Sequence, residues 1–148
     1  MGLGEFESED KCQHAERSAC IFAEYAQQQH LDENFAEQVT YLFKMHSNKE
    51  LLNMQDTKPE LIILMEADLL DEEGALRVIW YCATKAIQGA DSYLEVADFI
   101  QMGSDKRQDN PMITPLAKEI WNKKIQFVND FLTELRFDID TDISFLDY

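Results

Sequence analysis

Apolar side chains return every three or four residues along most of this chain, and this spacing constrains the fold more than any other feature of the sequence. In the segment from residue 9 to residue 30, for example, Ala15, Ala19, Phe22 and Ala26 fall on one side of a helix. There is no convincing run of the apolar and polar alternation that a strand requires. The sequence therefore predicts an all-α fold, a single helical bundle of about five to six helices.

Capping residues and prolines predict where these helices begin. Asp32 and Ser92 stand where N-caps are expected, and the pairs Lys58-Pro59 and Thr114-Pro115 place a proline in the first turn of a helix. These signals predict helices at about 9–30, 32–46, 59–70, 75–87, 92–102 and 114–137. We expect one helical domain over residues 1–137, followed by an acidic tail over residues 138–148.

The charge and the apolar content exclude several classes of partner. Thirteen basic residues against twenty-nine acidic ones give a formal charge of −16, which repels nucleic acids and anionic membrane surfaces. The longest strongly apolar run, Leu61 to Met65, is far shorter than the roughly 20 residues that cross a bilayer. The first ten residues lack the basic and apolar parts of a secretory signal, and Cys12, Cys20 and Cys82 fit no disulfide or zinc pattern. We expect a soluble, cytoplasmic protein with reduced cysteines.

Three side chains with metal-ligand chemistry lie on apolar stripes or at their ends, where each is expected to point inward. They are His14, His46 and Asp68. Neutral imidazole and carboxylate together suit a divalent transition metal such as zinc, manganese or iron. The alternative is structural, because a histidine near a helix end often bonds a free carbonyl and an aspartate often caps its neighbour. Asp71, one turn beyond Asp68, suits capping of the next helix or a hydrogen bond to a ligand, whereas His30 falls in a turn and is set aside.

Familiar phosphate and nucleophile motifs are absent from the sequence, which contains neither a G-x-x-x-x-G-K loop nor G-x-S-x-G or H-E-x-x-H. The acidic run from Asp138 to Asp142 imitates the start of a calcium loop but lacks its glycine and its final glutamate. We interpret that run as part of a solvated tail.

Several segments, taken in order, resemble one family. Residues 65–75, Met-Glu-Ala-Asp-Leu-Leu-Asp-Glu-Glu-Gly-Ala, are similar to the Asp-Ala-Asp-Arg-Leu-Asp-x-x-Gly-Ala signature of small HD-domain metal-dependent phosphohydrolases. Residues 14–19 resemble the His-x-x-x-Ser-Ala helix start of that family, residues 45–47 the helix end before its last aspartate, and residues 110–117 its closing stretch. The chain departs from the signature at Leu69, where the family usually has arginine.

The resemblance implies a hydrolase that acts on a small phosphorylated molecule or a nucleotide with a bound divalent metal (Mn, Fe, Zn, Mg or Ni). It assigns His14, His46 and Asp68 as metal ligands and Asp68 as a catalytic residue. Independently of the resemblance, Arg17, Lys44 and Lys49 lie near these candidates in the sequence and could hold phosphate oxygens. The adjacent His-Asp pair of the family does not occur in this sequence, so we expect an N-terminally truncated form that binds metal weakly and has reduced or no activity. The alternative is a non-catalytic helical interaction module, which forms a homodimer through an exposed apolar face.

Overall fold

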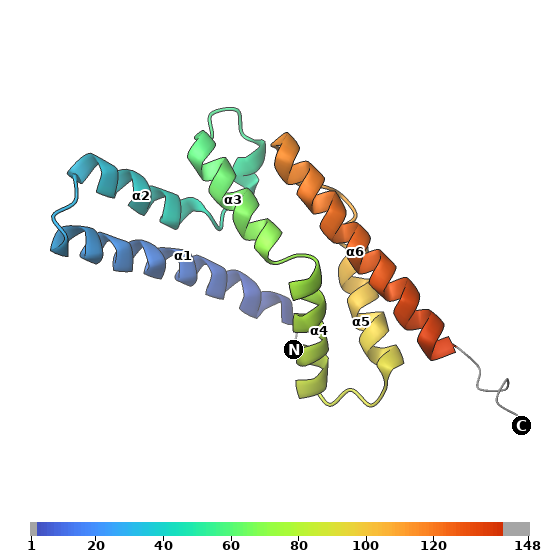
Figure 1. The fold of residues 1–148 in the computed structure, drawn as a ribbon. Coiled ribbons are helices and arrows are strands. Elements are labelled where there is room, and N and C mark those ends of the chain that lie inside the picture. The colour runs from blue at the N-terminus through green and yellow to red at the C-terminus, as the bar shows by residue number, and fades with distance from the viewer. Residues whose placement is uncertain (1–2, 141–148) are drawn as a thin grey trace, which may run out of the picture. The chain divides into compact units, whose positions relative to one another are not determined.

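A computed structural model describes the backbone of residues 3–140 and the side chains of residues 13–140. Over this range the fold is all-α, as predicted, with six α-helices, one short 3₁₀ helix and no strand (Figure 1). The elements are α1 (Leu3–Gln28), α2 (Glu33–Met45), η1 (Lys49–Asn53), α3 (Pro59–Asp71), α4 (Ala75–Ile87), α5 (Tyr93–Asp105) and α6 (Pro115–Asp140).

The capping residues identified in the sequence act as predicted. Asp32 Oδ1 accepts a hydrogen bond from the Phe35 N–H at 2.9 Å at the start of α2. Ser92 Oγ accepts one from the Glu95 N–H at 3.3 Å at the start of α5. Pro59 is the first residue of α3, where its missing N–H costs no helical hydrogen bond. Local chemistry therefore determines where these helices begin.

Other predicted boundaries were wrong. The first helix begins at Leu3 rather than near residue 9, and the segment predicted as a loop after α2 contains η1, which buries Leu52. The last helix continues to Asp140, since half-buried Ile139 extends its apolar stripe beyond Leu132. The predicted tail therefore begins inside α6, and residues 141–148 lie outside the described residues.

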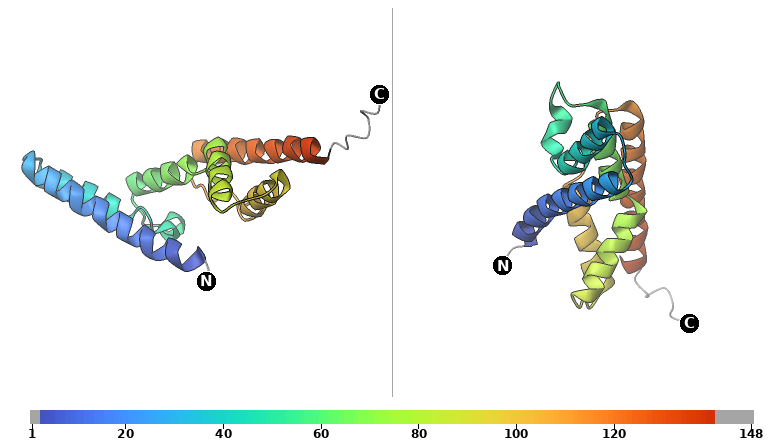
Figure 2. Two further views of the ribbon diagram at one scale, coloured as in Figure 1. Left: turned by 90° about the horizontal axis from the view of Figure 1, so that it is seen from below. Right: turned by 90° about the vertical axis from the view of Figure 1, so that its left-hand side faces the viewer.

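The chain divides into two compact units, Met1–Ala67 and Asp68–Tyr148. The single domain over residues 1–137 stays a prediction. In the first unit α1 and α2 form an antiparallel hairpin, seen side by side in Figure 1 and with α2 behind α1 in the left view of Figure 2. Small buried side chains on α1, namely Ala15, Ala19 and Ala26, let the two helices approach closely. Between them the rings of Phe22 and Phe43 lie 5.5 Å apart.

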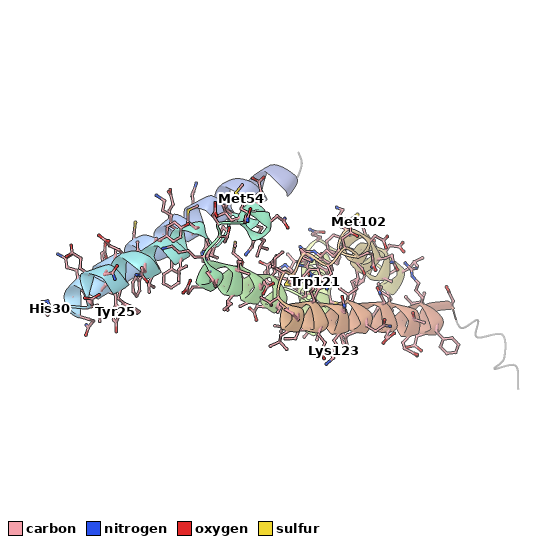
Figure 3. The ribbon with its side chains drawn as sticks, turned by 90° about the horizontal axis from the view of Figure 1, so that it is seen from above. Tyr25, His30, Met54, Met102, Trp121 and Lys123 are labelled. Carbon is pink, nitrogen blue, oxygen red and sulfur yellow. The ribbon has the colours of Figure 1, made fainter. Side chains whose placement is uncertain are left out.

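The second unit contains two apolar clusters, one of which lies between α4, α5 and α6. One cluster brings one or two residues from each helix together and consists of Val78, Ile100, Val128 and Leu132. The other packs the first turns of α6 against the loop before it and consists of Met112, Ala117, Trp121 and Ile125. Trp121 is labelled in Figure 3. Among the described residues, no helix combines the length and the apolar character that crossing a lipid bilayer requires.

An exposed ion pair joins α4 to α5 and predicts a pH effect. Lys85 Nζ donates to Glu95 Oε1 at 2.9 Å, and this hydrogen bond, together with that from the Asp91 N–H, lowers the pKa of Glu95 below its usual 4.5. A carboxyl group with a lowered pKa in the folded state stabilises that state above pH 4.5 and loses this effect as the pH falls through its folded pKa. Glu95→Gln should therefore flatten the pH dependence of the free energy of unfolding below pH 4.5, measured by urea titration. If Glu95→Gln and the wild type show the same pH dependence of the free energy of unfolding below pH 4.5, the prediction is contradicted.

Candidate metal-binding site

Two of the three predicted ligands face each other in the first unit. His14 lies on α1 and His46 is the C-cap of α2, and their ring centroids are 6.0 Å apart with the rings nearly perpendicular, at 75°. His46 is 8% exposed, so its predicted inward position is confirmed. The same prediction for His14 was wrong, because its side chain is exposed. The inward line of α1 runs through the neighbouring Ala15 and Ala19, which turns His14 about 100° away from the centre of that line.

The hydrogen bonds of His46 indicate which ring nitrogen carries the proton. His46 Nδ1 lies 2.6 Å from the carbonyl oxygen of Phe43. A carbonyl oxygen only accepts, so Nδ1 donates, and in the neutral ring the lone pair is on Nε2. The Ser47 hydroxyl lies 3.5 Å from Nε2. Nδ1 therefore makes the hydrogen bond to a carbonyl that the structural alternative predicts. The other nitrogen, Nε2, is the one that a metal ion would bind in this tautomer of the ring.

The spacing of the two rings is close to that of a shared metal ion. Two imidazoles bound to one ion through nitrogen–metal bonds of about 2.1 Å, at ligand angles of about 90–120°, hold their ring centroids roughly 4.5 to 5.6 Å apart. The observed separation of 6.0 Å is slightly longer, so the two rings would have to move a little closer to share an ion. Across residues 13–140, however, no group of three or more His, Cys, Asp or Glu side chains is placed to hold a metal ion. The histidine pair thus supplies two ligands, short of the three or four of a complete site.

The third predicted ligand, Asp68, lies on α3 and is half-buried. It is the first residue of the second unit, and its role as a ligand and catalytic residue stays a prediction. Asp71 is exposed, and the N-cap of α4 is Gly74, so Asp71 does not occupy the capping position. Its alternative role, a hydrogen bond to a metal ligand, stays a prediction.

The three basic residues proposed to hold phosphate differ in their surroundings. Arg17 and Lys44 are exposed, whereas Lys49 is half-buried and its Nζ donates to the Met65 carbonyl oxygen at 3.4 Å. Lys44 also lines an open groove of about 700 Å³ between α1 and α2, close to the turn that joins them. Neither histidine of the pair lines that groove. Phosphate binding by these three residues stays a prediction.

One buried charged cluster was missed by the sequence analysis. Glu73, only 1% exposed, lies in the turn between α3 and α4 and accepts from Arg77 Nη2 at 2.8 Å and from Arg107 Nη1 on its Oε1 atom. Lys124 Nζ donates to the Glu73 backbone carbonyl at 3.1 Å. The four-residue spacing of Glu73 and Arg77 is a helical ion-pair signal that could have identified half of the cluster. Arg107 is 34 residues away in the sequence, and no local pattern predicts its partner.

Comparisons of the chain with protein-family models, with curated proteins and with solved structures found no match.

Proposed function

We propose that this chain belongs to an HD-type metal-dependent phosphohydrolase and that its His14 and His46 bind a divalent metal ion for hydrolysis of a phosphate ester or nucleotide. The observation that supports this most directly is the facing pair of imidazoles, 6.0 Å apart, contributed by α1 and by the end of α2. The same two residues stand at the positions where the sequence resembles that family.

The surroundings of His46 support a ligand role more specifically. The Phe43 carbonyl oxygen fixes the ring through Nδ1, so the Nε2 lone pair is held in one direction without a further ordering cost. His14 is exposed on α1, so a metal ion can reach the histidine pair from solvent. A metal in such a site would polarise a phosphoryl oxygen and lower the pKa of bound water. The residues of this chain would hold and orient the ion.

The first test is metal affinity, measured by equilibrium dialysis with manganese and with zinc. His46→Ala and His14→Ala should each weaken binding at least tenfold, since each removes a direct ligand. His30→Ala is the matched control, because His30 is an exposed histidine in the turn after α1. Equal affinities in the wild type and all three variants would overturn the assignment of the pair.

The second test concerns Asp68 and the reaction. Manganese-dependent hydrolysis of p-nitrophenyl phosphate should be low in the wild-type chain and abolished in Asp68→Ala. Activity that is present but unchanged in Asp68→Ala would rule out a catalytic role for this residue while leaving the metal affinity of the histidine pair to be judged by dialysis.

A second candidate function is a helical interaction module. It is supported by the apolar surface of α4, where Leu76, Ile79, Trp80 and Ile87 are all more than half exposed. This function requires no metal and no phosphate, so a chain that fails both tests above but associates through α4 would favour it.

A further inference from the structure

Helix α4 has apolar side chains on two opposite sides, but only one of these sides is buried within the second unit. Val78, Tyr81 and Cys82 pack into the cluster shared with α5 and α6. On the opposite side Leu76, Ile79, Trp80, Ala83 and Ile87 are exposed, and they recur at intervals of three and four residues. An apolar stripe on a helix normally packs against another surface. Within the described part of the second unit, nothing covers the outer stripe of α4, which is defined by these five residues.

The charges of α4 are directed away from this stripe. The helix has two ionised side chains, Arg77 and Lys85. Arg77 pairs with buried Glu73, and Lys85 pairs with Glu95 of α5. The outer stripe is consequently free of charge over about 17 Å of helix, the length from Leu76 to Ile87. In a chain of net charge −16, such a surface suits a partner that is equally free of charge at the contact.

A second copy of the same helix meets that requirement. When two α4 helices are paired antiparallel about a two-fold axis near residues 81 and 82, Leu76 of one copy lies opposite Ile87 of the other, and Trp80 lies opposite Ala83. Each large indole thus meets a small side chain, and no like charges face each other. The contact is isologous, as in most homodimers.

The area available is enough for a reversible dimer. The exposed parts of Leu76, Ile79, Trp80 and Ile87 amount to roughly 400–500 Å² per copy, on typical side-chain areas. Two copies would bury roughly 1,000 Å² in total, the lower end of specific interfaces and typical of weak association. We propose that the outer stripe of α4 is the surface through which two copies of this chain form a reversible dimer. This inference deepens the second candidate function and does not depend on the histidine pair.

Sedimentation velocity over a range from low micromolar to near-millimolar protein tests the proposal. The wild-type chain should show a concentration-dependent monomer–dimer equilibrium. Ile79→Glu should raise the dimer dissociation constant at least about 100-fold, because the two-fold symmetry buries two unpaired carboxylates. Ile63→Glu on α3 is a matched control, since Ile63 is 62% exposed and Ile79 is 64% exposed, and it should leave the equilibrium unchanged. Ile87→Glu, at the other end of the stripe, should repeat the effect of Ile79→Glu.

A chain that stays monomeric over the whole range would overturn the proposal, and so would a dimer that Ile79→Glu and Ile87→Glu leave intact. Metal affinity measured on Ile79→Glu should equal that of the wild type, so failure of the dimer and failure of the metal site are separate results.

Discussion

Replacing Glu73 by alanine is expected to lower the free energy of unfolding by about 3–5 kcal/mol, because it leaves two guanidinium groups without their common partner in a buried setting. The Glu73 side chain is 1% exposed, that of Arg77 is 9% exposed and that of Arg107 is 29% exposed. The carboxylate joins the start of α4 to the end of α5, so its loss also releases the loop that leads into α6. Urea unfolding followed by the fluorescence of buried Trp121 measures the effect in the second unit.

The control for this prediction is Glu119→Ala. Glu119 also pairs with a basic residue, Lys123 at 2.7 Å, but both side chains are largely exposed. A surface pair of this kind contributes little to stability, because water and salt screen the two charges. If Glu73→Ala costs no more than Glu119→Ala, the buried cluster does not hold the helices together as described.

Replacing Gly103 by alanine is expected to destabilise the second unit by about 2–3 kcal/mol through overpacking. A Cβ atom at this position would lie 2.7 Å from Cζ and 2.5 Å from the hydroxyl oxygen of Tyr81, well inside van der Waals contact. The ring cannot move aside easily, because its hydroxyl accepts a hydrogen bond from Arg77 Nη1 at 2.6 Å. The clash should therefore displace α5 from α4.

A double-mutant cycle distinguishes this clash from loss of helix propensity. In a Tyr81→Leu background the added methyl group should cost less by at least about 1 kcal/mol, since the contacting ring is gone and residues in contact couple. Alanine is the better helix former, so Gly103→Ala should even stabilise α5 there if no other contact intervenes. An equal cost in both backgrounds would show that Tyr81 is not the obstacle.

The helices themselves could be predicted from local sequence. Helix starts are set by groups that act within three or four residues, namely the capping oxygens of Asp32 and Ser92 and the proline at position 59. Such local effects can be predicted from the sequence alone. The fourth helix, bounded by glycine and polar residues, was predicted at its observed limits of Ala75 and Ile87. The end of a helix was predicted less well where the sequence has no helix-terminating residue, as at the C-terminal end of α6.

The environment of the candidate ligands could be predicted only in part. The position of His46 follows from the apolar stripe of α2 that it ends, and it is buried as expected. His14 was predicted to point inward, but the buried alanines that begin one residue further along the helix, at Ala15, define the inward side. A difference of one residue in a helix is about 100°, which is enough to turn a side chain from the core to solvent. The second ion-pair partner of Glu73, Arg107, is 34 residues away, and local spacing does not predict such a tertiary contact.

The most direct test of the central claim is nuclear magnetic resonance of the three histidine rings during a zinc titration of the full chain. Before zinc is added, His46 should carry its proton on Nδ1, as its bond to the Phe43 carbonyl oxygen requires. Zinc should then shift His46 Nε2 and one nitrogen of His14 together and leave His30 unchanged. Shifts of equal size at all three rings, or no shift at His14 and His46, would contradict a shared metal site at this pair.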